Sequence, residues 1–201
     1  MNKCTYAGVS STLLAILVSL ATIGCSTSSV SGGRILPRPE NSYRVVIEKA
    51  LAYAQANRQR YGVNDAKEEL AFLSESVDRL GQRHVRMQQI YRRVPVWGHQ
   101  LIVHFSKTDE PNGISGTYRP IDPITESEPI LSEKDAEVNT LRVKTEGWKT
   151  VETKKYIYVG ALRPSLVYLV TIEKESERLR VFIDAKDGSV LHEISEVQEA
   201  R

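Results

Sequence analysis

Both cysteines of this 201-residue chain, Cys4 and Cys25, lie within its first 25 residues. The residues that follow contain no thiol, so an apolar core and backbone hydrogen bonds must hold their fold without disulfides or cysteine-bound metal. The composition allows this, since 41% of the residues are apolar and 26% are charged, as in ordinary globular domains. With 27 basic and 25 acidic side chains, the chain has no overall field that favours a nucleic-acid partner.

The first residues are typical of an export signal. Lys3 is followed by an apolar segment, Leu13–Ile23, which is much shorter than the roughly 20 residues that a membrane-spanning helix needs. Gly24 and Cys25 come next. The run LATIGC that they complete resembles the lipobox of bacterial lipoprotein signal peptides. That resemblance implies cleavage after Gly24 and a thioether-linked lipid on Cys25.

One residue departs from that pattern, because Thr22 stands where lipoproteins usually have leucine, and an ordinary secretory cut nearby therefore stays open. Either cut predicts an exported protein. With the lipid, we expect anchoring in the bacterial cell envelope, and Ser26 after the cysteine favours the outer membrane if the cell is Gram-negative. The serine-rich segment that follows predicts a flexible tether over residues 25–40.

The rest of the chain predicts an α+β fold of two small modules in tandem, each a helix followed by an antiparallel sheet. The modules span residues 41–119 and 131–196, a proline-containing linker covers 120–130, and residues 197–201 form a tail.

In the first module, apolar residues recur at helical spacing from Asn41, with Ser42 as the expected N-cap and Gly62 after the end. The expected strands cover 70–73, 84–91, 99–105 and 114–118, with Leu80-Gly81 as a turn and Asn112-Gly113 as a hairpin or loop signal. In the second module, Ser132–Asp135 resembles a capping box that opens a helix to Arg142. Strands are expected over 155–159, 165–173, 179–186 and 189–194, with a turn at Asp187-Gly188.

Three segments of the first module have a distinctive pattern: LGQRHVRMQQIY at 80–91, VPVWG at 94–98, and Val103-His104. Together they resemble the fungalysin/thermolysin propeptide (FTP) motif over about 25 positions of fixed spacing. Residues 131–136 and 180–190 resemble the PepSY-type second half of the same propeptides. The loop 106–116 looks shortened relative to that family, and residues 144–163 do not match it.

In that family the propeptide helps its zinc metallopeptidase to fold and inhibits it until removed. This sequence contains no H-E-x-x-H zinc-binding motif, no nucleophile elbow and no phosphate-binding glycine loop. His99 and His104 are five residues apart on an expected strand and thus face opposite sides, so we expect neither a metal nor another cofactor. The resemblance implies a non-enzymatic, lipid-anchored regulator of a thermolysin-like metallopeptidase acting in trans. An envelope binding or sensor module for another protein or peptide, or a structural lipoprotein, stays open.

Two roles are open for the motif residues: they hold a turn at 94–98, or they dock the partner. His84, Arg86 and Gln88 share one face of an expected strand, and Asp184 is placed to accept hydrogen bonds from the Asp187-Gly188 turn. The complete set is His84, Arg86, Gln88, Gln89, Tyr91, Pro95, Val96, Trp97, Gly98, His104, Asp184 and Gly188.

The C-terminal tail is a candidate for insertion into a protease cleft, and its first residues are Ser195, Glu196 and Val197. Charge is unevenly spread: residues 79–107 carry basic but no acidic side chains, whereas 109–137 are mainly acidic. These stretches either pair within the fold or steer a partner.

Overall fold

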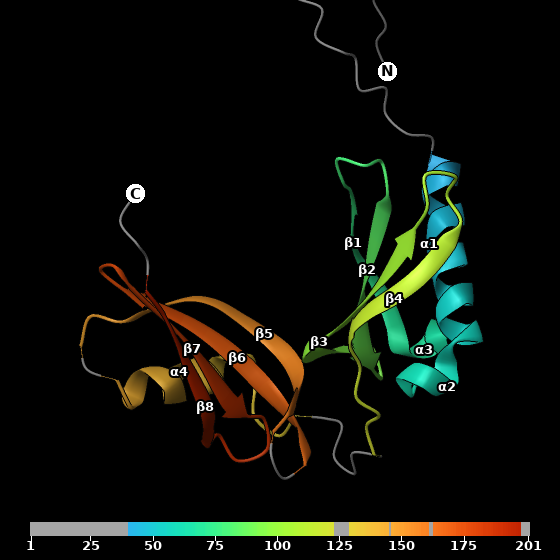
Figure 1. Cartoon of the computed structure of the whole chain (residues 1–201). Coiled ribbons are helices and arrows are strands. Elements are labelled where there is room, and N and C mark those ends of the chain that lie inside the picture. Colours follow the sequence, from blue (N-terminus) through green and yellow to red (C-terminus); the bar gives the residue numbers. More distant parts are fainter. Residues whose placement is uncertain (1–39, 123–128, 145, 161–162, 198–201) are drawn as a thin grey trace, which may run out of the picture. The chain divides into compact units, whose positions relative to one another are not determined.

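The computed structural model describes residues 40–122, 129–144, 146–160 and 163–197, and all of these belong to one compact unit. The predicted signal peptide and tether, including Gly24 and Cys25, lie outside the described residues except for Glu40, which begins a helix, and most of the predicted linker lies outside them as well. Helices and antiparallel strands confirm the α+β class (Figure 1). No helix in the described part of the chain is long and apolar enough to cross a membrane.

The helices are α1 (Glu40–Ala56), α2 (Arg58–Tyr61), α3 (Ala66–Glu69) and α4 (Glu133–Arg142). The strands are β1 (Leu70–Val77), β2 (Arg83–Tyr91), β3 (Val94–Phe105), β4 (Pro111–Thr117), β5 (Lys149–Val159), β6 (Pro164–Lys174), β7 (Glu177–Asp184) and β8 (Val190–Val197). They pair in the order β1-β2-β3-β5-β6-β7-β8, and β4 pairs with β3 outside this path. All pairs are antiparallel except β3 with β5, which meet as a parallel pair at Val96 and Ile157.

Helix α1 covers one face of the sheet β1–β4 (Figure 1). Its buried residues Val46, Ala50 and Ala54 are four apart and therefore lie on one side of the helix. They pack on strand residues with no exposed surface, namely Val85, Met87, Leu101, Val103 and Phe105. The alternation of these residues along β2 and β3 confirms the faces predicted from the sequence.

The predicted helix start was wrong, since α1 begins at Glu40 and Ser42 lies inside it. Helical spacing identifies the buried face but does not fix the first turn. The predicted end is confirmed in a modified form: the short α2 follows α1, and Gly62 closes it in the left-handed conformation, at φ 75°. Asp65 caps α3 by accepting the backbone N–H of Lys67.

The predicted turn at residues 94–98 was also wrong. The turn consists of Arg92 and Arg93, with φ of 48° and 68°, and Tyr91 pairs directly with Val94. A two-residue hairpin turn needs positive φ at both of its residues, and asparagine and glycine are usual there. Because both positions are arginine here, nothing in the sequence indicated the turn. Likewise Asn112-Gly113 lies within β4, and the β3–β4 connection runs through residues 106–110.

The second sheet, β5–β8, is a meander with α4 on one face. Helix α4 begins with the predicted capping box, in which Ser132 and Asp135 each accept the other's backbone N–H. The helix ends at Arg142 as expected. Seven consecutive residues of β6, 166–172, are buried, because both faces of this strand are covered.

Strand β3 contributes to both cores. Its second half packs under α1, whereas Val96 is fully buried with Ile157, Val170 and Ile183 of the second sheet. The register explains the change: Ile90 pairs with Pro95 but Gln88 pairs with Gln100. Residues 96–99 therefore bulge away from β2, and this bulge is where β3 reaches β5.

Candidate functional site

The face of β1–β4 opposite α1 is polar. His84, Arg86 and Gln88 alternate with buried residues along β2 and share this face, as predicted. Across the hairpin they stand opposite three β3 residues, in the pairs His84 with His104, Arg86 with Ile102, and Gln88 with Gln100. Arg86 is exposed and donates to Oε1 of Gln100 over 3.1 Å.

A chain of four polar side chains crosses three elements of this face. His84 Nδ1 lies 2.8 Å from His104 Nδ1, and His84 Nε2 lies 3.3 Å from Oδ2 of Asp78. At the other end, His104 Nε2 lies 2.7 Å from Oγ of Ser115. The sequence did not suggest the His84–His104 contact, because twenty residues separate the two histidines and only the strand register brings them together.

Asp78 is fixed by the β1–β2 loop. Its Oδ1 accepts the backbone N–H groups of Leu80 and Gln82, at 2.8 and 2.9 Å. The Gln82 hydrogen bond is the main cause that holds the pKa of Asp78 below its usual range, and the hydrogen bond to His84 adds to it. Burial lowers the pKa of His104, and the proximity of His84 lowers it further. Near neutral pH this row of polar side chains therefore begins with an ionised carboxylate, that of Asp78, and includes a neutral imidazole, that of His104.

The side-chain amides of Gln88 and Gln89 both form hydrogen bonds with backbone groups. Gln88 Nε2 donates to the carbonyl oxygens of Val96 and His99, at 2.7 and 3.0 Å. These are the two ends of the β3 bulge. Gln89 is 2% exposed, and its side-chain amide accepts the N–H of Arg119 over 3.1 Å and donates to the Arg119 carbonyl over 2.7 Å. Gln88 and Gln89 therefore have a structural role, which is to hold the backbone of the β3 bulge and of Arg119, respectively.

Replacing Gln89 with leucine should lower the free energy of unfolding by about 1–3 kcal/mol, because leucine matches the volume but leaves the peptide groups of Arg119 without their partner. Urea unfolding monitored by circular dichroism measures the loss. Gln100→Leu is the matched control: its amide is only partly buried, so we expect a change below about 1 kcal/mol. Equal losses in the two variants would contradict this role of Gln89.

The remaining motif residues of the first half lie in or beside β3. Pro95 pairs with Ile90 inside the hairpin, and Gly98 is exposed at φ 74° within the bulge. Tyr91 is half-buried against the second core, and the guanidinium of Arg92 lies 5.4 Å from its ring centre. Pro95 and Gly98 therefore shape the bulged strand rather than a turn.

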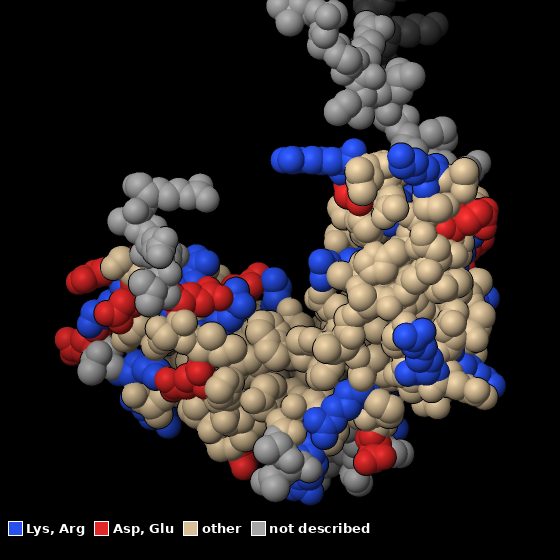
Figure 2. All heavy atoms as spheres, in the orientation of Figure 1, with Lys and Arg blue, Asp and Glu red and all other residues tan. Residues whose placement is uncertain are grey.

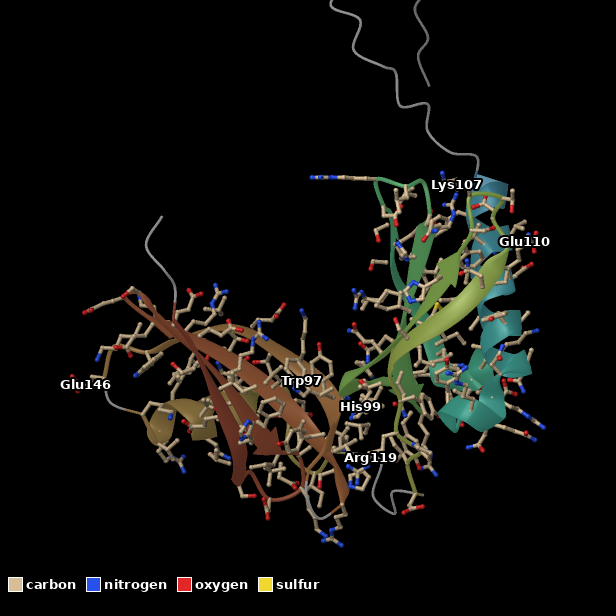
Figure 3. All side chains as sticks on the ribbon, viewed as in Figure 1. Trp97, His99, Lys107, Glu110, Arg119 and Glu146 are labelled. Carbon is tan, nitrogen blue, oxygen red and sulfur yellow. The ribbon has the colours of Figure 1, made fainter. Side chains whose placement is uncertain are left out.

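Trp97 is partly buried and belongs to an aromatic cluster on the face of β5–β8 opposite α4. Its ring meets Tyr156 and Phe182 edge to face, at 5.2 and 5.3 Å. The guanidinium carbon of Arg180 lies 5.7 Å from the Trp97 ring. Figure 3 shows Trp97 on β3 beside the strands of the second sheet. Trp97 is one of the motif residues for which a turn or a docking role is open, and these contacts assign it to packing between β3 and the second sheet.

His99 is separate from the His84–His104 pair and lies near Arg119 (Figure 3). Burial lowers the pKa of His99, and the positive charge of Arg119 acts in the same direction. Within the described residues its Nδ1 is buried without a hydrogen-bond partner. We therefore assign His99 no part in the polar chain.

Asp184 and Gly188 form the β7–β8 turn. The Asp184 carboxylate accepts the backbone N–H of Lys186 over 2.8 Å, whereas Gly188 of the predicted turn donates to the backbone carbonyl of Asp184 over 2.9 Å. Gly188 has φ 76°, and a Cβ there would lie 2.6 Å from the side-chain nitrogen of Asn139 in α4. Both residues thus fix the turn against α4.

Strand β8 includes the first residues of the predicted tail. Ser195, Glu196 and Val197 pair with Leu179, Arg178 and Glu177 of β7, and Glu196 forms an ion pair of 2.8 Å with Arg180. These three residues are therefore held in the sheet. Residues 198–201 lie outside the described part, and insertion of the tail into a cleft stays a prediction.

The basic and acidic stretches meet where Arg83 pairs with Asp109. Arg83 contacts both Glu75 and Asp109, the latter at 2.8 Å, and Lys49 of α1 lies 2.6 Å from Glu110. Over β5–β8, the side of the molecule shown in Figure 2 has both signs of charge interspersed. Internal pairing thus accounts for part of the charge pattern.

A groove of about 610 Å³ lies between α3 and the β2–β3 hairpin. Its lining combines acidic side chains of α3 with basic and aromatic side chains of the hairpin, and consists of Lys67, Glu68, Glu69, Ile90, Tyr91, Arg92 and Arg93. Both the groove and the polar face are formed by residues between Lys67 and Ser115.

Known proteins resemble this chain. Residues 68–118 match the Fungalysin/Thermolysin Propeptide Motif. Thermolysin of Alicyclobacillus acidocaldarius subsp. acidocaldarius is 30% identical over 151 residues, covering 68% of this chain and 27% of the relative. Bacillolysin of Bacillus subtilis (strain 168) is 28% identical over 153 residues, covering 68% and 29%. The chain thus spans less than a third of the length of these relatives.

Among solved structures, the Bacillus megaterium YpeB C-terminal domain aligns with a TM-score of 0.40 and 16% identity, over 83% of this chain and 70% of that one. The matched residues 68–118 contain β1–β4, together with His84, His104 and all of the groove lining except Lys67. Residues 68–118 of this chain therefore form a propeptide-like module that matches the fungalysin/thermolysin propeptide motif.

Proposed function

We propose that this chain is a non-enzymatic regulator of a thermolysin-like zinc metallopeptidase, acting in trans as inhibitor, folding helper or both. The observation that carries the proposal is the propeptide motif at residues 68–118, together with similarity to thermolysin and bacillolysin. A propeptide module acts by binding its enzyme, so its surface must be formed in advance. The first sheet supports this, because its core is complete under α1 while its opposite face is polar.

The peptidase assay uses the full chain in detergent and a thermolysin-like peptidase of the same bacterium. For an inhibitor, the initial rate of peptide hydrolysis should fall in proportion to added chain and level off near one equivalent. For a folding helper, denatured peptidase should regain more activity on dilution when the chain is present. A serine peptidase of the subtilisin type is the specificity control.

Failure of both assays at a tenfold excess of the chain would overturn the proposal. If a pull-down from the native envelope then yields a binding partner that is not a peptidase, the chain is a binding or sensor module instead. A chain ending at Val197 tests the tail, because it removes only residues 198–201 and keeps β8 complete. Loss of inhibition in this variant, with unchanged binding, is expected if the tail enters the cleft.

The proposal places the chain on the outside of the cytoplasmic membrane or on the outer membrane, held by lipid on Cys25. Two or three acyl chains make such attachment firm, since each buried methylene contributes about 0.8 kcal/mol. Replacing Cys25 with serine should move the protein from the membrane fraction to the soluble fraction. Recovery of the unsubstituted protein in the soluble fraction would contradict the anchor. Nucleic acid has no part in this proposal.

A further inference from the structure

The polar chain on β1–β4 has only one consistent arrangement of protons when both imidazoles are neutral. The Asp78 carboxylate only accepts hydrogen bonds, so His84 carries its proton on Nε2 and directs a lone pair from Nδ1. His104 must then donate from Nδ1 across the 2.8 Å contact. The Nε2 atom of His104 consequently accepts a hydrogen bond from the Ser115 hydroxyl group.

Each ring therefore directs Nδ1 at the other ring and has its Nε2 held by an oxygen. Histidines that bind metals usually donate from the second ring nitrogen to a carboxylate or another oxygen, which fixes the orientation of the ring. His84 does so toward Asp78, and His104 can do so toward Ser115 once its proton lies on Nε2. The planes of the two rings make an angle of 76°, and the ring centres are 5.0 Å apart. A cation bound by both Nδ1 atoms would take the place of the shared proton.

We propose that His84 and His104 bind a divalent transition-metal cation of the class that prefers imidazole, such as Zn²⁺, through their two Nδ1 atoms. This inference is independent of any action on a peptidase. On binding, the His104 proton moves from Nδ1 to Nε2, and the resulting Nε2–H donates a hydrogen bond to Oγ of Ser115, so both Nδ1 lone pairs face the metal. No proton is released from the neutral pair.

The geometry requires little movement. Zinc–nitrogen bonds of about 2.0–2.1 Å at a tetrahedral angle separate two nitrogens by about 3.3 Å, against 2.8 Å here. Rotation of the two side chains provides the difference. Gly113 stands opposite His104 and has no side chain to obstruct the ring. The His84 side chain is 26% exposed, so solvent reaches the site.

The site has two protein ligands. Within the described residues no group of three or more His, Cys, Asp or Glu side chains is arranged to hold a metal. Water therefore completes the coordination, and we expect binding weaker than at closed sites with four protein ligands. The Asp78 carboxylate, which lies 3.3 Å from Nε2 of His84, places a negative charge beside the site.

Long-range ¹H–¹⁵N spectra of the imidazole groups test this in the full chain, labelled with ¹⁵N-histidine and held in detergent. Without metal, His104 should show the uncommon Nδ1–H form and His84 the Nε2–H form. With Zn²⁺, His104 should change to the Nε2–H form, and both Nδ1 signals should shift together and saturate. The position-specific signals separate this site from zinc bound by the thiols of Cys4 and Cys25.

The variants His84→Gln and His104→Gln should each lower Zn²⁺ affinity at least tenfold, and Asp78→Asn should lower it about 10- to 100-fold. His192→Gln is the matched control, because His192 is an exposed histidine that stacks on Tyr158 in the second sheet. Absence of any shift at millimolar Zn²⁺, or equal shifts at His192, would overturn the proposal. Should a variant fail to fold, the spectra of the unsubstituted chain decide alone.

Discussion

Replacing Gly116 with alanine should lower the free energy of unfolding by at least about 3 kcal/mol. A Cβ at this position would lie 2.2 Å from the carbonyl oxygen of Gln100 and 3.2 Å from Cα of Leu101. Both are backbone atoms of β3, so no side chain can move aside. The φ of 113° is in addition a conformation that alanine avoids. Strand β4 must therefore move away from β3.

For a domain of this size the loss corresponds to a decrease in melting temperature of roughly 6–12 °C, which calorimetry measures directly. Gly113→Ala is the matched control in the same strand. Its Cβ would lie at an ordinary 3.7 Å from a carbon of His104, and we expect a change within about 1 kcal/mol. Similar losses in the two variants would show that β4 does not approach β3 at Gly116 as described.

The second large effect is expected at Phe182, which has no exposed surface. The centre of its ring lies 5.3 Å from the ring centre of Trp97, 4.8 Å from that of Tyr158 and 5.7 Å from that of His192. Phe182→Ala should cost about 3–5 kcal/mol, because it removes the apolar transfer energy and leaves a cavity. Phe182→Leu keeps most of the volume and should cost about 1.5 kcal/mol or less.

The Trp97 contact also predicts coupling between the two sheets. A double-mutant cycle of Phe182→Ala with Trp97→Ala should give an interaction energy of about 0.5–1.5 kcal/mol. Since β3 belongs to both cores, the two sheets should unfold in a single transition, measured by tryptophan fluorescence and by hydrogen exchange in β2. Two separate transitions in the unsubstituted protein would contradict this shared role of β3.

Much of the local structure follows from the sequence, because its causes lie within a few residues. The capping box at Ser132 and Asp135 places the start of α4. Alternation of polar and apolar residues assigns His84 and Gln88 to one face of β2 and Met87 to the other. The propeptide resemblance likewise depends on residues at fixed spacing in one stretch of chain, and it is confirmed over 68–118.

The wrong predictions for residues 92–98 share one cause. The local sequence there is compatible with more than one backbone conformation, and only tertiary packing selects between them. Arg92 and Arg93 occupy a turn that normally selects asparagine and glycine. Pro95 and Gly98, read as turn residues, lie in a bulged strand that joins the second sheet. In each case the tertiary contacts of β3 outweigh the local preference.

By itself the sequence determined the α+β class, the faces of the strands and the propeptide-like character of the first half. Only the tertiary structure decided which side chains meet: His84 with His104, Gln89 with Arg119, and Trp97 with Phe182. Alternation in a strand tells which face a residue occupies, but the residue beside it on the next strand depends on register. Register here results from a two-residue turn and a four-residue bulge in β3, and neither leaves a clear local signal.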